Sequence, residues 1–269
     1  MLICIDAGNS SITYGIYKEN ELVCTFKTMT QETTSLKKMY DDFMLALKEY
    51  GLLLYDMEFA MISNVVERLN PIFKEFCKKI NIECYFIEYN SPLGLTNTLN
   101  NEADLAADTY VGCYQAAYKY PLPLVVIDLG SVTNITLVNE KREIEGGVIY
   151  PGIISSYRHV ASMIAPSIKI TASPVDDIIG KDKREAMNSG MLYGSVNAIN
   201  GILSMIREEK GYEYMNVIMT GGLGFYLSSY IDGATYDENL IIDGLNNIYN
   251  EIGKKLYLRT KDKPIISSD

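Results

Sequence analysis

Two short carboxylate-containing turns recur in this 269-residue chain, at 6–8 (Asp-Ala-Gly) and 128–130 (Asp-Leu-Gly). Each follows an apolar stretch and leads into another. Glycine lets backbone N–H groups approach a phosphate closely and permits a positive φ. A carboxylate before the glycine can hold Mg²⁺, which prefers oxygen ligands and keeps several waters. We therefore expect both turns to bind phosphate, with Asp6 and Asp128 as magnesium ligands.

A third glycine turn, Thr220–Gly222, follows an apolar stretch near the end of the chain, and its bare backbone would accept an adenosine. One such turn alone is common structural chemistry, but two matched copies and a late Thr-Gly-Gly favour nucleotide binding. The chain has neither a G-x-x-x-x-G-K-[ST] nor a G-x-G-x-x-G pattern. The residues expected to bind the nucleotide are Asp6, Gly8, Asn9, Ser10, Asp128, Gly130, Ser131, Thr220, Gly221 and Gly222.

Strands must position these turns. The pattern of apolar residues predicts three antiparallel strands, at 2–5, 11–17 and 22–26. A second set of strands begins at 124–127 in the same context, which indicates that a supersecondary unit is duplicated. The segment 145–152 is rich in glycine and proline and predicts a turn. Predicted helices cover 34–50, 103–118, 153–164, 183–209 and 243–257. Whether the helix at 183–209 breaks near Gly190 or Gly194 is left open.

Composition and charge argue against several classes of function. The formal net charge of −10 argues against nonspecific binding to nucleic acid or to an anionic membrane. The five cysteines form no C-x-x-C pair, which fits reduced thiols. No apolar run approaches the ~18 residues of a membrane span, so we expect a cytoplasmic protein. The single histidine, His159, makes a carboxylate the expected general base.

The ordered series of motifs resembles the type III pantothenate kinases. The opening strand and turn resemble their D-x-G-N-[TS] motif, and 128–131 resembles D-x-G-T. Each short motif is weak evidence, but their common order along nearly the whole chain is strong. The other matching segments are 62–66 (Ile-Ser-Asn-Val-Val), 146–152 (Gly-Gly-Val-Ile-Tyr-Pro-Gly), 179–181 with 189–194, 220–222 and 240–249.

The resemblance implies an α/β, two-domain actin-like (ribonuclease H-like) fold with duplicated mixed sheets flanked by helices. We expect an N-terminal domain at 1–115 and a C-terminal domain at 116–269, and leave open whether the terminal helix packs back across the boundary. The implied activity is ATP-dependent phosphorylation of pantothenate to 4'-phosphopantothenate by a homodimer that uses Mg²⁺ and K⁺ or NH₄⁺. The alternatives are a diverged, nucleotide-binding accessory protein and a kinase for another small hydroxyl substrate.

The resemblance also suggests roles for individual residues. The family's general base, the Asp of its G-x-D-R motif, carries over to Asp104, with Asp108 as a rival on the same face of the predicted helix. Leu105 then stands where the family has Arg, and Lys183 where it usually has Thr, which puts activity on pantothenate in question. The expected substrate-binding residues are Asn9, Gly147 and Lys183.

Overall fold

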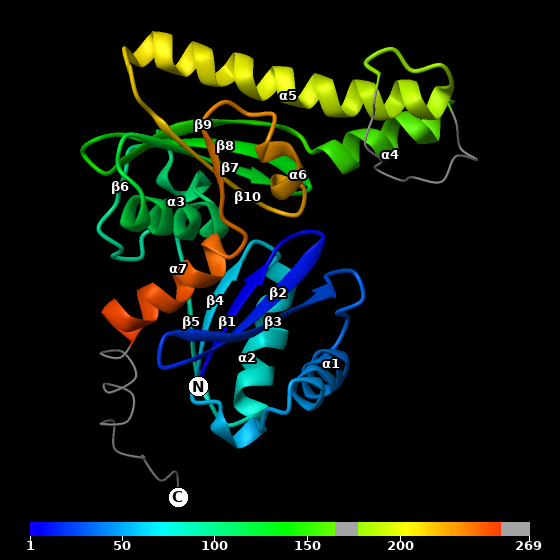
Figure 1. Ribbon diagram of the computed structural model, residues 1–269. Coiled ribbons are helices and arrows are strands. Elements are labelled where there is room, and N and C mark those ends of the chain that lie inside the picture. Colours follow the sequence, from blue (N-terminus) through cyan, green and yellow to red (C-terminus); the bar gives the residue numbers. More distant parts are fainter. Residues whose placement is uncertain (165–176, 254–269) are drawn as a thin grey trace, which may run out of the picture. The chain divides into compact units, whose positions relative to one another are not determined.

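The computed structural model describes residues 1–164 and 177–253 (Figure 1). These residues form two compact units. Unit 1 comprises Met1–Leu95, Leu99–Gln115 and 239–253, and unit 2 comprises Thr96–Thr98 and Ala116–Glu238. The domain boundary expected after residue 115 stays a prediction, because compactness alone does not establish independent folding.

Unit 1 is built on a five-stranded mixed sheet in the order β3-β2-β1-β4-β5. The three early strands form the expected antiparallel meander, and β4 pairs with β1 in parallel. The strands are β1 (Leu2–Ala7), β2 (Ser11–Lys18), β3 (Glu21–Met29), β4 (Phe59–Asn64) and β5 (Glu83–Phe86). The α-helices are α1 (Leu36–Glu49), α2 (Asn70–Lys79), the first part of α3 (Ala107–Lys119) and α7 (Leu240–Ile248). Three short 3-10 helices, η1 (Leu54–Asp56), η2 (Glu67–Leu69) and η3 (Glu102–Asp104), and a π-helix, η4 (Tyr249–Gly253), complete the unit.

Helices cover both faces of this sheet. Side chains alternate across a strand, and Ile3 and Ile5 face a core shared with Phe43 of α1 and Phe76 of α2. On the opposite face of β2, a Cβ on Gly15 would collide with the side chain of Ile242, which lies on α7. The apolar face of α7 and the small Gly15 at the contact therefore place α7 on the face of the sheet opposite α1 and α2 (Figure 1).

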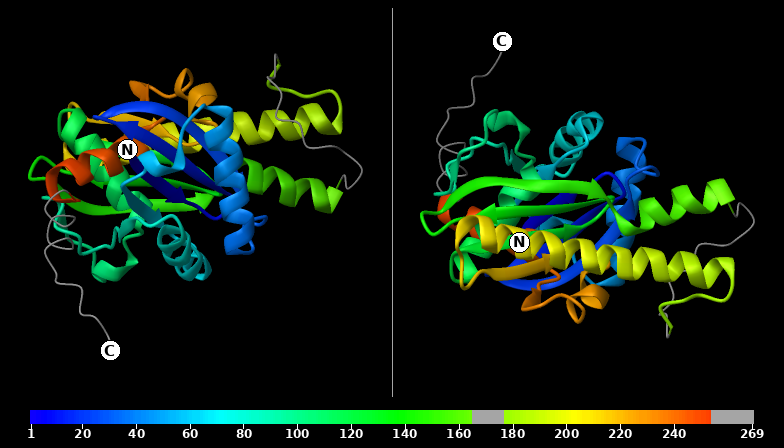
Figure 2. Two further views of the ribbon diagram at one scale, coloured as in Figure 1. Left: turned by 90° about the horizontal axis from the view of Figure 1, so that it is seen from below. Right: turned by 90° about the horizontal axis from the view of Figure 1, so that it is seen from above.

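Unit 2 is built on a six-stranded mixed sheet in the order β11-β10-β7-β8-β9-β6. Helix α5 packs against one face, where Val196, Ile199 and Leu203 meet the apolar side chains of β7 and β8. Figure 2 shows α4 and α5 running side by side. The elements are β6 (Thr96–Asn97), β7 (Leu124–Leu129), β8 (Val132–Val138), β9 (Glu143–Pro151), β10 (Asn216–Thr220), β11 (Ala234–Tyr236), α4 (Ile153–Ile164), α5 (Lys183–Lys210) and α6 (Gly224–Ser228).

The duplication predicted from the sequence is confirmed by the topology. In unit 1 the order β3-β2-β1-β4-β5 corresponds to β9-β8-β7-β10-β11 in unit 2. In each copy the first strand pairs antiparallel with the second and parallel with the strand on its other side. Asp6 and Asp128 are both the penultimate residue of that first strand, with the same burial along it. The fold class, α/β with two mixed sheets flanked by helices, is likewise confirmed.

Two local predictions, for 145–152 and for the last helix, differ from the structure, and the structure decides a third that was left open. The segment 145–152, expected as a turn, lies mostly in strand β9. Helix α5 is continuous through Gly190 and Gly194, where added side chains would meet nothing within 4 Å. Helix α7 begins at Leu240 and ends at Ile248, and positions 254–257 of its predicted range lie outside the described residues.

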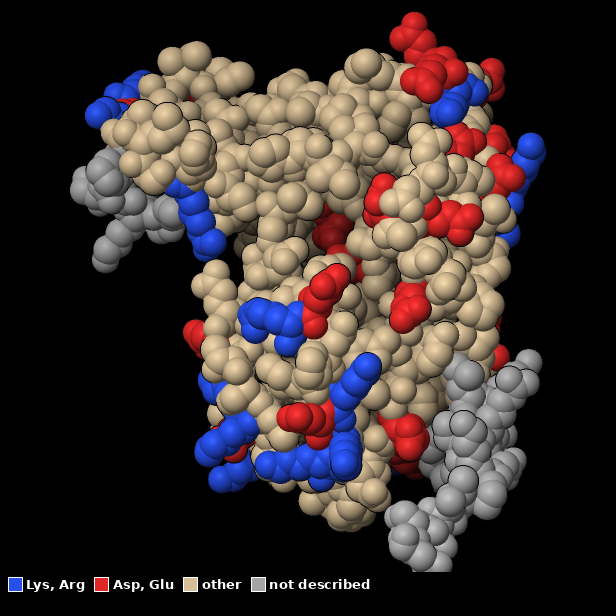
Figure 3. Space-filling model, turned by 180° about the vertical axis from the view of Figure 1, so that it is seen from behind, with Lys and Arg blue, Asp and Glu red and all other residues tan. Residues whose placement is uncertain are grey.

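Uncharged residues cover most of the face drawn in Figure 3, and the acidic and basic side chains gather in groups on it. On α1, Lys38 and Asp42 form an ion pair of 2.6 Å between residues one helical turn apart. Among the described helices, none combines the length and apolar character needed to cross a membrane.

Candidate functional site

The first turn lies at the carboxyl end of β1 in unit 1. The Gly8 backbone N donates to the carbonyl of Ser11 over 3.0 Å, and the Thr30 hydroxyl donates to the carbonyl of Gly8 over 2.6 Å. The side chains of Asn9 and Ser10 are exposed, and Asp6 is half-buried. The turn is thus fixed by the residue that follows β3, while the side chains of Asn9 and Ser10 face outward.

The second turn has the matching place in unit 2. The Gly130 backbone N donates to the carbonyl of Val132 over 3.0 Å. The carbonyl of Ser131 accepts from the Gly152 backbone N over 3.1 Å and from the Ser155 hydroxyl over 2.8 Å. A Cβ on Gly152 would come 2.8 Å from the Ser131 carbonyl oxygen. The start of α4 therefore holds this turn, and only glycine fits at the contact.

The third turn lies beside the second. Strands β7 and β10 are parallel neighbours, and Thr220 pairs with Asp128. Gly221 has a φ of +89°, and a Cβ there would come 2.6 Å from the Leu129 carbonyl oxygen. Parallel strands end at one edge of a sheet, so the structure brings the 128–131 and 220–222 residues together within unit 2. The 6–10 residues are gathered separately within unit 1.

The two candidate bases have different settings, and the expectation that they share one helix is wrong. Asp104 ends η3, is exposed, and its Oδ1 accepts from the Asn101 side-chain amide over 2.7 Å. Asp108 lies in the first turn of α3, which begins at Ala107. Leu105 interrupts the helix with an extended backbone (φ −76°, ψ 108°).

Asp108 is partly buried, and burial raises its pKa. Its Oδ1 accepts from the Thr109 backbone N over 2.6 Å, a hydrogen bond that opposes this shift. Leu105 is only 5% exposed. The Leu105 side chain is thus buried within unit 1. Its place in the sequence, next to the exposed Asp104, does not predict this burial.

The expected substrate-binding residues are not all gathered at one turn. Asn9 belongs to the first turn, whereas Gly147 lies within β9 opposite Thr136. A Cβ on Gly147 would collide with the carbonyl oxygen of Ile135 on the neighbouring strand. This close strand packing is by itself a sufficient reason for a glycine at this position. Lys183 is the exposed first residue of α5, next to the helix-capping Asp182.

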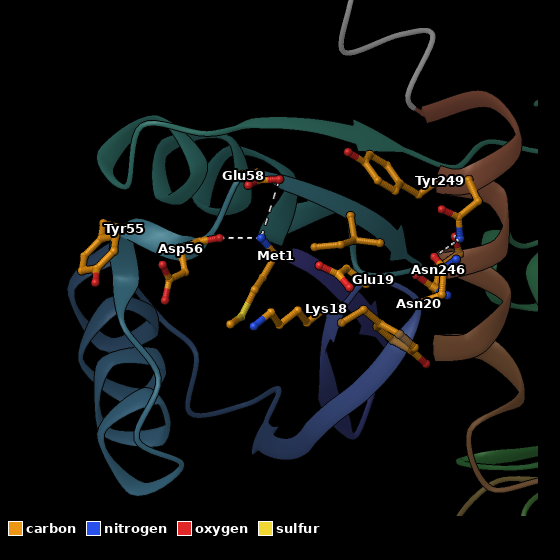
Figure 4. Close-up of a pocket in the computed structure, with 12 residues that line it drawn as sticks. Met1, Lys18, Glu19, Asn20, Tyr55, Asp56, Glu58, Asn246 and Tyr249 are labelled. Carbon is orange, nitrogen blue, oxygen red and sulfur yellow. Dashed lines mark hydrogen bonds and ion pairs between the residues drawn. The ribbon is translucent and has the colours of Figure 1, made fainter.

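A cavity of about 550 Å³ lies elsewhere on unit 1 (Figure 4). Its lining includes Leu2 at the start of β1, the Lys18–Asn20 turn, and Asn246 on α7. Because Asp6 lies toward the opposite end of β1, this cavity is separate from the first glycine turn. The three turns, rather than the cavity, are the candidate functional site.

Sequence reasoning missed the residues that support the turns. Thr30 reaches the first turn from 22 positions away, and Gly152 reaches the second across β8 and β9. Such contacts depend on tertiary packing and leave no local signal. The Pro-Gly dipeptide at 151–152, directly before a predicted helix, was the one available sign of a special backbone contact.

Comparison with known proteins agrees with this architecture. The family model for type III pantothenate kinases matches residues 2–205. A type III pantothenate kinase from Caulobacter vibrioides is 32% identical over 257 residues, covering 93% of this chain and 97% of the relative.

Solved structures share the fold. One, from Campylobacter jejuni and assigned to the Baf family of transcriptional activators, has a TM-score of 0.57 at 23% identity and covers 94% of this chain and 99% of its own. Another, assigned as a 2-dehydro-3-deoxygalactonokinase from Sinorhizobium meliloti, has a TM-score of 0.56 at 12% identity and covers 94% and 97%. The chain therefore has the same fold as these two proteins. Together with the family match over most of its length, this shows that the chain belongs to the type III pantothenate kinase family.

Proposed function

We propose that the chain transfers the γ-phosphoryl group of ATP to the hydroxyl of pantothenate, giving 4'-phosphopantothenate, the first step of coenzyme A synthesis. The observation that carries this proposal is the family match over residues 2–205, joined to a duplicated strand-turn-strand unit with an Asp-x-Gly turn in each copy. In phosphoryl transfer most of the rate enhancement comes from positioning and charge stabilisation. Glycine turns with outward-facing polar groups are suited to that task.

At each of the first two turns, Gly8 and Gly130 leave room for a phosphate of ATP to approach the backbone, and Asn9, Ser10 and Ser131 offer side-chain donors to it. The adenosine lies against Thr220–Gly222. The closeness of the second and third turns in unit 2 supports this division.

The residues present fit Mg²⁺. Asp6 and Asp128 are half-buried carboxylates beside the phosphate turns. Mg²⁺ is usually held by one or two carboxylates together with phosphate oxygens and waters, not by an all-protein cage. Within residues 1–164 and 177–253, no group of three or more His, Cys, Asp or Glu side chains forms such a cage. When bound, the ion would neutralise charge on the phosphates.

We propose Asp108, rather than Asp104, as the general base. The pantothenate oxygen bonds to the γ-phosphorus, the bond from that phosphorus to the β,γ-bridging oxygen breaks, and ADP leaves. The hydroxyl proton passes to the carboxylate. A base works better when its pKa approaches the operating pH, and burial raises the pKa of Asp108, whereas Asp104 is exposed.

With Asp108 as the aspartate of the G-x-D-R motif, the segment 106–109 (Ala-Ala-Asp-Thr) aligns with it, and Thr109 replaces the family Arg. The substrate carboxylate then needs another cation, for which the exposed Lys183 stays our proposal. Asn9 and Gly147 complete the proposed substrate contacts. A higher Michaelis constant for pantothenate in Lys183→Ala, without a lower kcat, tests this role.

Membership of the family supports three further proposals: a requirement for K⁺ or NH₄⁺, a homodimer and a cytoplasmic location. Exchange of K⁺ for Na⁺ in the assay tests the first. A sedimentation mass of one chain, 30.2 kDa, at micromolar concentration would contradict the second. Cell fractionation tests the third. The proposed activity itself is tested by pantothenate-dependent release of ADP.

A further inference from the structure

An aromatic cluster follows the third glycine turn in unit 2. It consists of Phe225 and Tyr226 on α6 and Tyr236 at the end of β11. The Phe225 ring centroid lies 5.7 Å from that of Tyr226 and 5.9 Å from that of Tyr236, with near-perpendicular ring planes. The three rings therefore pack edge to face as one unit.

The cluster is tied to the Thr220–Gly222 turn. The Tyr236 hydroxyl donates to the carbonyl of Gly221 over 3.4 Å. A Cβ on Gly224 would come 2.5 Å from the Tyr236 ring, so glycine at this position lets the ring lie against the start of α6. The turn and the rings thus hold each other in place.

Two of the rings face solvent. Phe225 is 67% exposed and Tyr226 is 66% exposed, whereas Gly224 and Leu227 of the same helix are buried. Large exposed aromatic side chains next to one another often mark a binding surface. Phe225 is three positions after Gly222 in the sequence, so their Cα atoms are at most roughly 11 Å apart. That distance is within the span of a nucleoside whose phosphates lie at the neighbouring Asp128 turn.

We propose that the exposed face of Phe225 stacks on the adenine base of ATP, with Tyr226 and Tyr236 bracing the ring. This inference rests on the proposed function and names the contact that holds the base. A phenylalanine offers no hydrogen bond to the edge of a base, and aromatic stacking tolerates any base. The platform therefore contributes affinity for purine nucleotides in general, without selecting ATP over GTP.

The test compares ATP, GTP and inorganic tripolyphosphate, each with Mg²⁺, by calorimetric titration of the full chain. Loss of one base–aromatic stack in Phe225→Ala should raise the dissociation constants for ATP and GTP about 5- to 150-fold. Tripolyphosphate has no base, so its affinity should stay within about twofold of the unsubstituted chain. Phe225→Tyr keeps the aromatic face and should restore nucleotide binding.

Tyr214→Ala is the matched control, because Tyr214 is 84% exposed but precedes β10, at the end opposite Thr220. It should bind all three ligands as the unsubstituted chain does. Unchanged ATP affinity in Phe225→Ala, or an equal loss for ATP and tripolyphosphate, would overturn the inference. Failure of the unsubstituted chain to bind ATP at all would instead contradict the proposed function.

Discussion

Gly221 lies directly against Asp128, so closely that a Cβ on the glycine would come 2.7 Å from the Oδ1 of the carboxylate. The register of the sheet explains this contact, since Thr220 pairs with Asp128 across β10 and β7. The residue proposed to face the adenosine and the carboxylate proposed to face the metal are therefore set by one pair of neighbouring strands.

Replacing Gly221 should disturb both turns. Gly221→Ala places a side chain at a φ of +89° and against the Leu129 carbonyl oxygen, so the free energy of unfolding should fall by about 1–3 kcal/mol or more. Gly222→Ala is the matched control, because nothing lies within 4 Å of a Cβ there, and its stability should change by less than about 0.5 kcal/mol. Urea unfolding measures both. Equal stabilities of the two variants would refute the close packing.

Removing either turn carboxylate should stop turnover. Asp6→Ala and Asp128→Ala should each lower Mg²⁺-dependent ATP turnover at least about 100-fold, the scale of losing one preorganised charge-stabilising group. Asp41→Ala removes an exposed carboxylate of α1 and serves as the control. Turnover is measured by ADP release and folding by circular dichroism. Normal turnover in both folded variants would rule out paired phosphate turns.

The two candidate general bases, Asp108 and Asp104, can be distinguished by substituting each in turn. Asp108→Asn should lower kcat at least about 100-fold, as expected for a positioned general base, while ATP affinity changes little. Asp104→Asn should keep most of the activity, because that side chain is exposed. The acidic limb of the kcat/KM profile should lie above the usual Asp pKa of about 3.9, since burial raises the pKa of Asp108. The reverse order of the two variants would return the role to Asp104.

The same burial predicts an effect on stability. Because the folded pKa of Asp108 is raised above its unfolded value, the folded state binds this proton more tightly, and stability is lost as pH rises through the folded pKa. Asp108→Asn removes this titration, so its stability relative to the unsubstituted chain should be greater at pH 7.5 than at pH 4.5. Urea unfolding at both pH values measures the difference. If the difference in free energy of unfolding between the two proteins did not grow with pH, burial of the ionised Asp108 carboxylate would not destabilise the fold.

The sequence alone predicted those parts of the fold that depend on local pattern. The strand before each aspartate, the meander and helix α4 at Ile153–Ile164 follow directly from apolar runs and turn residues. The duplication was visible because Asp6 and Asp128 occupy the same position in the same pattern.

Predictions failed where tertiary contacts decided the structure. Alanine at 103 favoured a helix, but burial of Leu105 in an extended conformation delays the start of α3 to Ala107. Glycine at 147 suggested a turn, yet it serves strand packing against Ile135. The support of the turns by Thr30 and Gly152 was hidden for the same reason, because each contact joins residues far apart in the sequence.

The central claim is that the chain phosphorylates pantothenate. The most direct measurement incubates the purified chain with ATP, Mg²⁺, K⁺ or NH₄⁺ and pantothenate, and follows ADP release and the product mass together. The account predicts ADP release that depends on pantothenate, matched mole for mole by pantothenate that has gained one phosphoryl group, and absent in Asp108→Asn. ATP binding without any phosphorylated pantothenate under either monovalent cation would contradict it.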